Sequence, residues 1–408
     1  MKFELPRKII SWLNLRCRPW LSLMFPVCLF VASASATQVT NTTQSALMTA
    51  LAGGGTVTFT VDGTINLSQT LIIATNVVLD GVGHNVSING SNGVRVFFVN
   101  PGINFTVKNL SVIKGSVVGT NSTNVASGAG IYNNTGIVAV VNCVFSSNMA
   151  VGFGPNATGS AAAGGAIYNQ SGTLNITNST FLTNSATGGK AGIIGSVAGN
   201  AYGGALCNNN GTLNVSGASF GGNSSLGGTD IGSASGGSGN SLGSAFGGAV
   251  FTTNGSVMIL NCRFYGNQAL AQPVSYGNFS ESSVGGANGG AVCQFGGTVT
   301  MLQSTLQANS ATGGSFNRYN NTAGNGCGGA LFSQGIFAAT YCTFAGNGAS
   351  GGSNGNLAGD GDGGAIFNMG TCSVFDCSFA SNYVISGISG EGPFGGTTFS
   401  GTANGGGI

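Results

Sequence analysis

The sequence predicts an all-β fold, a parallel β-helix solenoid of about 10–11 turns behind an N-terminal export signal. Three observations predict it. A two-part repeat recurs at fixed spacing, apolar positions within the repeat alternate with a period of two, and 75 of the 408 residues are Gly without a collagen-like Gly-X-Y order. A helical solenoid does not fit, because the repeat has no 3.6-residue period and Gly is costly inside helices.

Residues 1–36 have the features of a signal peptide: a basic start, an apolar run from Trp20 to Val31 and small residues that end at Ala36. The run is too short for a membrane-spanning helix, which needs about 20 residues. We therefore expect export to the extracellular space or the outer-membrane surface. The rest of the chain holds six Lys and Arg against eight Asp and Glu. Such a sparse charge excludes a nucleic-acid partner, which requires a basic surface.

Residues 37–56 are expected to form an N-terminal cap with a short helix over Ala46–Leu51, because the end of a solenoid must be shielded from strand pairing. Residues 57–127 carry short apolar runs separated by Gly and Asn, such as Val77–Leu79 and Phe97–Val99. These runs predict about three less regular turns of the coil.

Residues 128–408 contain the regular repeat, Gly-Gly-Ala plus an aliphatic residue followed by Phe-x-x-Asn, with the last unit truncated. In seven units the Phe position follows the first Gly by 16 or 17 residues, whereas 19 to 27 residues separate it from the next unit. Packed segments keep their length and surface loops tolerate insertion. One half of each unit is therefore predicted to be packed strands, and the other half a loop excursion.

Two positions of the repeat predict continuous columns in the stacked coil, where equivalent residues recur about every 4.8 Å. The Phe position predicts a core stack of large apolar side chains. The Asn position predicts a ladder of amides at a bend, with ligand binding by the row of amides as the alternative. The core stack comprises Phe145, Phe181, Phe220, Phe264, Leu306, Phe344 and Phe379. The structural ladder comprises Asn148, Asn184, Asn223, Asn267, Asn309, Asn347 and Asn382.

The excursions are expected to stack along one side of the coil, and they carry most of the charged residues of the repeats together with several aromatic rings. An aromatic, nearly neutral side suits contact with carbohydrate or protein, whereas the alternative is that the rings fold back and cover the coil. The rings are Phe153, Tyr202, Phe246, Tyr276, Phe279, Phe316, Tyr319, Tyr383 and Phe394.

Eight Cys lie outside the signal, and most of them occupy columns that predict buried thiols. Cys342 and Cys377 occupy the same column in consecutive units, so stacking places their Cα atoms about 4.8 Å apart, within disulfide range. Export implies an oxidising compartment. A Cys342–Cys377 disulfide is therefore the hypothesis, and two buried thiols are the alternative. No metal is expected, because the close Cys pairs of zinc sites are absent and His84 is the single His.

The paired tetrapeptides resemble the repeats of the polymorphic outer membrane proteins, known from chlamydiae and other bacteria, over about residues 128–408. The resemblance implies a right-handed coil that is exported and carried to the cell surface as an autotransporter passenger, with adhesion as its role. It also implies membrane anchoring through a C-terminal β-barrel. The 408 residues do not include one, because they stop at Gly405–Ile408 inside the first tetrapeptide of an eighth unit.

We therefore expect a non-catalytic surface or secreted protein without a cofactor, which adheres to a host-cell or matrix protein or glycan. A polysaccharide lyase or glycosidase is the alternative, since pectin-degrading enzymes use similar coils. Glycoside hydrolysis needs two nearby carboxylates, and only Asp360 and Asp362 are close in the sequence, where a solvated turn is the other interpretation. End-to-end self-association into a surface layer or fibre is a second alternative, because an open strand edge can template pairing.

Overall fold

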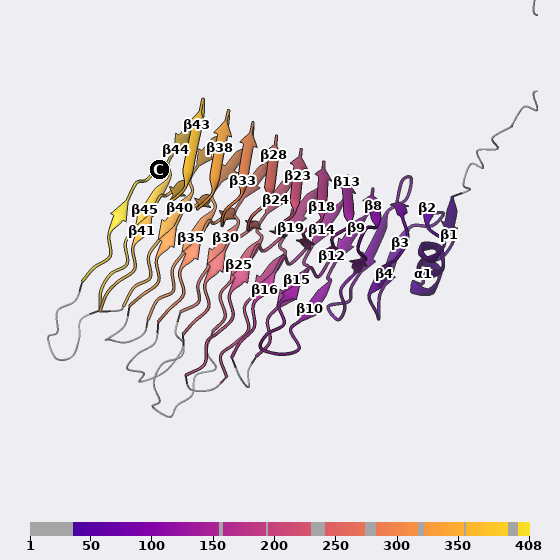
Figure 1. Ribbon diagram of the computed structural model, residues 1–408, viewed down its shortest axis with the longest axis horizontal. Coiled ribbons are helices and arrows are strands. Elements are labelled where there is room, and N and C mark those ends of the chain that lie inside the picture. The colour runs from indigo at the N-terminus through magenta and orange to yellow at the C-terminus, as the bar shows by residue number, and fades with distance from the viewer. Residues whose placement is uncertain are drawn as a thin grey trace, which may run out of the picture. The chain divides into compact units, whose positions relative to one another are not determined.

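The computed structural model describes residues 36–154, 158–192, 195–229, 241–273, 283–316, 322–354, 356–390 and 399–408. Residues 1–35 of the expected signal peptide lie outside this set. The chain divides into two units, Met1–Ala34 and Ser35–Ile408. The second unit is a parallel β-helix, as the sequence predicts, and every strand pairing in it is parallel (Figure 1). The described part holds no helix long and apolar enough to span a bilayer.

Three sheets, A, B and C, enclose the main core. Sheet A has 11 strands, which are β1 Thr37–Val39, β2 Gly55–Phe59, β5 Val77–Asp80, β8 Asn104–Lys108, β13 Ile137–Val141, β18 Thr173–Thr177, β23 Thr212–Ser216, β28 Ser256–Leu260, β33 Thr298–Leu302, β38 Ile336–Thr340 and β43 Thr371–Phe375. Sheet B has 10 strands, which are β3 Gly63–Asn66, β6 Val86–Asn89, β9 Ser111–Ile113, β14 Val144–Ser146, β19 Thr180–Leu182, β24 Ser219–Gly221, β29 Arg263–Tyr265, β34 Thr305–Gln307, β39 Thr343–Ala345 and β44 Ser378–Ala380. Sheet C has nine strands, which are β4 Leu71–Ile73, β7 Phe97–Val99, β12 Ile131–Asn134, β17 Ile167–Gln170, β22 Leu206–Asn209, β27 Val250–Thr252, β32 Val292–Gln294, β37 Leu331–Ser333 and β42 Ile366–Asn368.

Two further sheets, D and E, have eight strands each and form the base of the excursions. Sheet D comprises β10 Ser116–Val118, β15 Met149–Val151, β20 Ser185–Thr187, β25 Ser224–Leu226, β30 Gln268–Leu270, β35 Ser310–Thr312, β40 Gly348–Ser350 and β45 Tyr383–Ile385. Sheet E comprises β11 Ala126–Ser127, β16 Ala162–Ala163, β21 Ala201–Tyr202, β26 Ala245–Phe246, β31 Ala287–Asn288, β36 Gly326–Cys327, β41 Gly361–Asp362 and β46 Ala403–Asn404. Each regular coil runs through sheets E, C, A, B and D in turn.

The repeat dictates the corners between these strands. The first Gly of each Gly-Gly-Ala lies between sheets E and C with φ from +58° at Gly164 to +69° at Gly289, a conformation that other residues adopt at a cost. The corner between sheets A and B is also left-handed, and the short polar residues that tolerate this conformation, such as Asn142 and Asn178, recur there.

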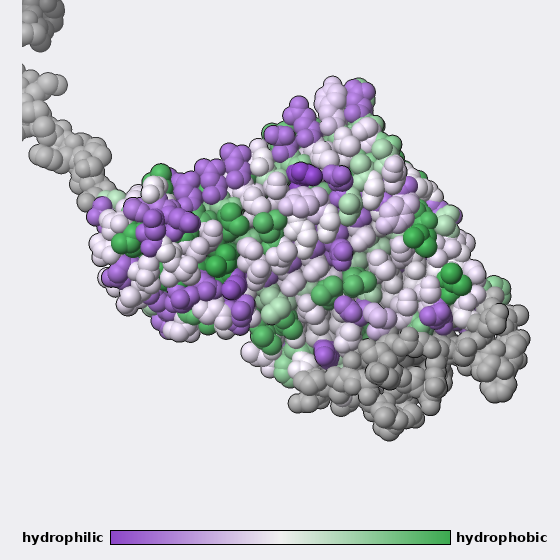
Figure 2. Space-filling model, turned by 180° about the vertical axis from the view of Figure 1, so that it is seen from behind, coloured by the Kyte–Doolittle hydropathy of each residue, from purple (hydrophilic) through white to green (hydrophobic). Residues whose placement is uncertain are grey.

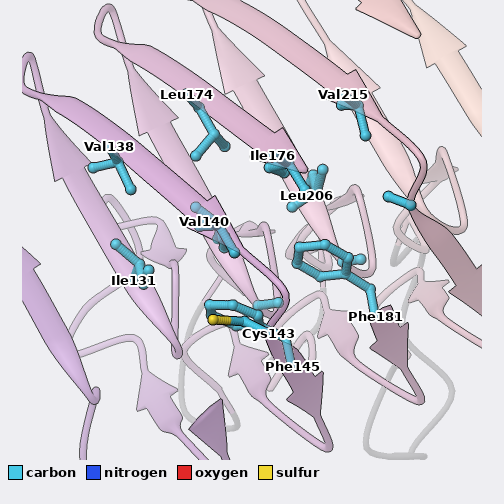
Figure 3. Packing of buried hydrophobic residues seen from close by; sticks show 14 of the residues in the cluster. Ile131, Val138, Val140, Cys143, Phe145, Leu174, Ile176, Phe181, Leu206 and Val215 are labelled. Atoms are coloured by element: carbon cyan, nitrogen blue, oxygen red, sulfur yellow. The ribbon is translucent and has the colours of Figure 1, made fainter. Parts of the chain in front are cut away.

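The main core consists of like side chains stacked on like (Figure 3). Phe181 and Phe220 stack with ring centroids 4.9 Å apart, and Phe220 and Phe264 with centroids 4.7 Å apart. Leu306 continues this column and is fully buried. The predicted core stack therefore lies inside the coil, and fully burying one such side chain contributes about 1.5–3 kcal/mol.

The N-terminal end is closed by the helix α1 Gln44–Ala52 and by β1, which pairs with β2 and is the edge strand of sheet A. The Thr43 side chain accepts a hydrogen bond from the backbone N–H of Ala46 and so caps the helix. Leu47 and Leu51 of the helix are buried in the main core. The helix lies within residues 37–56, where the sequence places a capping helix.

We call the segments that leave sheet D and return as sheet E the arms, and they lie together on one side of the coil (Figure 1). Alanines meet between sheets D and E, as Ala150, Ala186 and Ala201 do. Further out, backbone hydrogen bonds of 2.8–3.2 Å zigzag between outgoing and returning segments. Gly199 donates to Gly189, Gly228 to Gly199 and Gly243 to Gly228. The same pattern recurs where Gly324 donates to Gly314, Gly352 to Gly324, Gly359 to Gly352, Gly387 to Gly359 and Gly401 to Gly387. In the described parts of the arms, these glycines thus belong to a hydrogen-bonded backbone layer.

Candidate ligand-binding groove

The outer face of sheet C carries a column of mostly aromatic residues, which we call the ring column. It is in register from coil to coil and consists of Phe98, Tyr132, Tyr168, Cys207, Phe251, Cys293, Phe332 and Phe367. Period-two alternation places it opposite the inward residues Ile167 and Leu206. The column therefore lies outside the main core, and sheet E covers it to form a second hydrophobic cluster.

At its N-terminal end the ring column is an ordered stack. The centroids of Phe98 and Tyr132 are 5.2 Å apart, as are those of Tyr132 and Tyr168. The Arg95 guanidinium lies 5.1 Å from the Tyr132 ring and donates hydrogen bonds to the carbonyls of Ser127 and Gly128. Because Ser127 ends the first strand of sheet E, Arg95 closes the exposed edge of this second cluster.

The stack is interrupted at Cys207, because a thiol replaces a ring in the next position. Phe251 follows Cys207 in the register and is two coil steps from Tyr168, about 9.6 Å along the coil. Tyr202, from β21, leans toward the Phe251 side, with its ring 4.8 Å from Phe251 and 5.1 Å from Phe246. The space beside Tyr168 stays open. We call it the Cys207 gap.

The Cys207 gap belongs to a groove of about 260 Å³, which we call the aromatic groove. The rings of Tyr168, Tyr202, Phe251 and Phe295 line it together with smaller side chains. The lining comprises Val125, Ala163, Tyr168, Tyr202, Cys207, Asn209, Phe251, Thr253 and Phe295, and none of these residues is charged. Figure 2 shows the surface from behind relative to Figure 1, and there hydrophobic residues form separate small patches among polar ones.

Polar groups form one rim of the aromatic groove. The Asn209 amide donates to the Tyr168 hydroxyl at 2.9 Å and to Gln170 Oε1 at 3.0 Å. The Tyr168 hydroxyl donates to Gln170 Oε1 at 2.8 Å, and the Thr253 hydroxyl donates to Asn209 Oδ1 at 3.0 Å. These contacts fix the rim across three coils. Because a hydroxyl oxygen has two lone pairs, Tyr168 and Thr253 each retain acceptor capacity toward a ligand.

The aromatic groove is electrically neutral at physiological pH. Burial raises the pKa of the Tyr168 and Tyr202 phenols above their ordinary value. Burial likewise raises the pKa of the Cys207 thiol, so this sulfur stays protonated and is a poor nucleophile. The groove can thus bind an uncharged ligand through its rings and hydroxyl groups, and it offers neither an acid nor a base.

The seven Asn of the predicted ladder lie in one continuous row between sheets B and D. Along the row, each side-chain N–H donates to the Oδ1 of the next Asn at 2.9–3.0 Å. Each also donates to a backbone carbonyl, as Asn184 does to Phe145. Each of those Oδ1 atoms additionally accepts the backbone N–H of the Asn before it, as in the Asn148–Asn184 pair. From Asn148 to Asn347 both amide hydrogens of each side chain are therefore engaged, whereas Asn382, at the end of the row, donates to the Phe344 carbonyl alone.

A second ladder, which sequence reasoning missed, follows the ring column at the corner between sheets C and A. Asn133 donates to Asn169 and Asn169 to Asn208, both at 2.7 Å, and Asn208 continues to Thr252. Further along, Ser333 donates to Gln294. The sequence signal is a polar residue directly after each ring-column position from Tyr132 onward. Because its identity changes from Asn to Thr, Gln and Ser, the column lacks the uniformity that marks the first ladder.

The hypothesised Cys342–Cys377 disulfide is wrong for this structure, in which both residues are free thiols. The Cys377 sulfur instead accepts a hydrogen bond from the Cys342 backbone N–H at 3.3 Å. Ser179 and Ser304 make the same contact in their coils, with Cys143 and Cys262. Side chains stacked in register point the same way, so their sulfurs are separated by about one coil step, 4.8 Å, rather than the 2.05 Å of a disulfide.

The adjacent carboxylates Asp360 and Asp362 are used in strand-to-strand contacts. Asp360 accepts hydrogen bonds from Thr402, and Asp362 accepts one from Asn404 at 2.8 Å. Asp80 pairs with Lys108 at 3.0 Å, and Asp62 with His84 at 3.1 Å. Among the described residues, no three His, Cys, Asp or Glu side chains gather in a way that could hold a metal ion.

The rings expected on the excursions have different fates. Tyr202 and Phe246 fold back on the ring column, and Phe316 is buried among Leu242, Ala323 and Val284. Tyr383 is 47% exposed, and Phe153 is half-buried. Tyr276, Phe279, Tyr319 and Phe394 lie outside the described residues. Tyr202, Phe246 and Phe316 thus fold back on the protein, and Tyr202 also lines the aromatic groove. Contact of the rings with carbohydrate or protein stays a prediction.

Fold and groove together define a parallel β-helix solenoid with a neutral, ring-lined groove on one side. No family model and no curated protein matches the sequence. Among solved structures, the chain is similar to ORF18 of Geobacillus virus E2, with 11% identity over 85% of this chain, 57% of that chain and a TM-score of 0.28. It is also similar to PfbA, a surface adhesin of Streptococcus pneumoniae, with 12% identity over 86% of this chain, 93% of that chain and a TM-score of 0.27. At this level of similarity neither protein's role transfers to the present chain.

Proposed function

We propose that the protein is exported and acts outside the cell as a non-catalytic binding protein, an adhesin of the passenger type, which contacts host-cell or matrix molecules through the aromatic groove. The observation that carries the proposal is a rigid, uncharged groove lined by four aromatic rings and rimmed by hydroxyl and amide groups. A concave site lined by aromatic side chains with a few polar groups at its edge is the usual form of a ligand-binding pocket.

The chemistry of the described residues favours binding over catalysis. Asp62, Asp80, Asp360 and Asp362 each accept hydrogen bonds from neighbouring coils or turns. The lining of the aromatic groove contains no carboxylate, and glycoside cleavage needs two of them on either side of a bound sugar. The expected signal peptide and the resemblance of the repeats to polymorphic outer membrane proteins support the extracellular location.

The test is a binding survey with the full exported protein on cultured epithelial cells, immobilised matrix proteins and a glycan panel. The same wells are assayed for reducing ends and for unsaturated uronides. We expect saturable binding to at least one of these surfaces without release of sugar products. Absence of binding to all three surfaces would refute adhesion, and product release would instead establish the polysaccharide-active alternative.

A further inference from the structure

The ring column supplies a measure of what fits in the Cys207 gap. Between Phe98, Tyr132 and Tyr168 one flat six-membered ring occupies each coil step, at 5.2 Å between centroids. The next step holds the Cys207 thiol instead of a ring. Two steps separate Tyr168 from Phe251, so a single ring of a ligand can lie on Tyr168 with Tyr202 and Phe251 as the opposite wall.

The lining selects the chemistry of that ring. Its walls are aromatic, and its rim presents the Tyr168 and Thr253 hydroxyls, each with acceptor capacity left after the contacts with Asn209. A ligand that presents C–H groups on one face fits the aromatic rings, and hydrogen-bond donors at its edge fit the two hydroxyl groups. The Tyr168 hydroxyl already accepts from Asn209, and the Thr253 hydroxyl accepts from the Asn210 backbone N–H, so each oxygen has one lone pair left. A purely aromatic side chain or an acyl chain would leave these two lone pairs unused, whereas hydroxyl groups of a ligand can donate to them.

The absence of charge in the groove lining restricts the ligand to uncharged compounds. None of the nine lining residues is charged, and Tyr168, Tyr202 and Cys207 are protonated at neutral pH. A carboxylate- or sulfate-bearing sugar would lose water there without gaining a cation, which is costly. A neutral hexopyranose meets every condition, with an apolar face, hydroxyl donors at its edge and no charge.

We propose that the Cys207 gap binds one pyranose ring of a neutral hexose glycan, stacked on Tyr168 with its hydroxyl groups toward Tyr168 and Thr253. This inference rests on the proposed function and names the ligand class of the same groove. The pyranose ring takes the place in the ring column that an aromatic side chain occupies in the preceding coils. The small Cys207 side chain therefore leaves the space into which the ligand enters.

Two variants close the site in different ways. Cys207→Phe supplies the missing ring from inside the column. Val125→Trp covers the opening from the rim, where Val125 is 49% exposed and its replacement leaves the core unchanged. Cys207→Ser keeps the gap open. Ile137→Trp is the matched surface control, because Ile137 is 50% exposed on β13 of sheet A, outside the groove lining.

Binding is measured by isothermal titration and saturation-transfer NMR with gluco-, galacto- and manno-oligosaccharides, an oligogalacturonate and a Trp-containing peptide as probes. We expect at least one neutral oligosaccharide to bind the wild type, Cys207→Ser and Ile137→Trp equally. Cys207→Phe and Val125→Trp should weaken it more than tenfold, with the transferred saturation on ring C–H protons. If Cys207→Phe does not fold, Val125→Trp alone decides.

Equal affinity in Val125→Trp and Ile137→Trp would overturn the assignment to this groove. Preference for the acidic oligosaccharide or the peptide would overturn the ligand class. If the protein adheres to cells or matrix but to no neutral oligosaccharide, the sugar inference fails while the proposed function survives. If it binds no surface at all, the proposed function itself fails.

Discussion

Substitution of an arm glycine tests the hydrogen-bonded arm layer most directly, because neighbouring backbone atoms leave no room for a side chain there. At Gly199 φ lies outside the left-handed region, so Ala can adopt the backbone. A Cβ at this position would nevertheless overlap the Ser160 carbonyl and approach the Gly189 nitrogen. Gly199 also donates to the Gly189 carbonyl at 2.8 Å and accepts from Gly228 at 2.9 Å. One methyl group must therefore push apart two arms.

The expected cost of Gly199→Ala follows from these contacts. Forcing a methyl group into packed backbone costs about 1–3 kcal/mol, and weakening two backbone hydrogen bonds costs about 0.5–1.5 kcal/mol each. The lower entropy of the unfolded Ala chain returns about 0.4–1 kcal/mol. We expect a net loss of roughly 1–5.5 kcal/mol in the free energy of unfolding.

Two other glycines are the controls, because one has only the left-handed backbone and the other has neither that backbone nor a close neighbour. Stability is measured by equilibrium denaturant unfolding followed by circular dichroism. Gly195, in the same arm, has φ +76° and no heavy atom within 4 Å of a Cβ, so Ala should cost only the left-handed strain, about 1–2 kcal/mol. Gly93 has neither constraint and should tolerate Ala within about 0.5 kcal/mol. A Gly199→Ala protein as stable as Gly93→Ala would refute the hydrogen-bonded arm layer.

Three further changes test the packing. Ser225 is buried without a partner for its hydroxyl, in a column where Ala186 and Ala269 precede and follow it, so Ser225→Ala should raise the free energy of unfolding by about 1 kcal/mol or more in denaturant titrations. Asn267→Leu should cost about 3–5 kcal/mol, because the Asn223 N–H groups and the Phe220 carbonyl lose their contacts with the Asn267 side chain and Asn309 Oδ1 loses one of its two donors. Asn214→Ala removes one exposed contact with Asn175 and should cost about a few tenths of a kcal/mol, so equal losses would contradict the ladder. Burial raises the pKa of the Cys143, Cys262 and Cys342 thiols to about 11, so the folded chain holds protons that the unfolded chain releases above about pH 9. The contribution of these thiols to the free energy of unfolding should be fully present below pH 9. It should fall between pH 9 and 11 by up to about 1.4 kcal/mol per thiol and pH unit. In melting curves recorded at a series of pH values, Cys262→Ala should make this fall less steep.

Much of the coil is predictable because side chains of one size class recur at one position. Phe220 and Asn267 belong to columns that the sequence shows directly, and stacking is the simplest reason for such uniformity. The arm layer was not predictable, because Gly199 and Gly228 have no side chain and so leave no periodic pattern. The disulfide hypothesis used the Cα separation of Cys342 and Cys377 but not the shared direction of their side chains.

The aromatic groove could be predicted only in part. The sequence places Tyr202 on an excursion and Tyr168 and Cys207 in one column, but only the fold shows that Tyr202 returns to cover that column. The proposed binding feature lies where the Cys207 thiol interrupts the ring column. The Cys293 thiol interrupts it again, but there the Phe295 ring contacts both Phe251 and Phe332. Sequence reasoning that looks for uniform columns passes over such interruptions.

A crystal structure of the protein grown with the neutral oligosaccharide that binds it best would test the central proposal most directly. We expect one pyranose ring in the Cys207 gap, about 5 Å from the Tyr168 ring, with the sugar hydroxyls toward Thr253. A sugar bound elsewhere, or a gap filled by a neighbouring side chain of the protein itself, would contradict it.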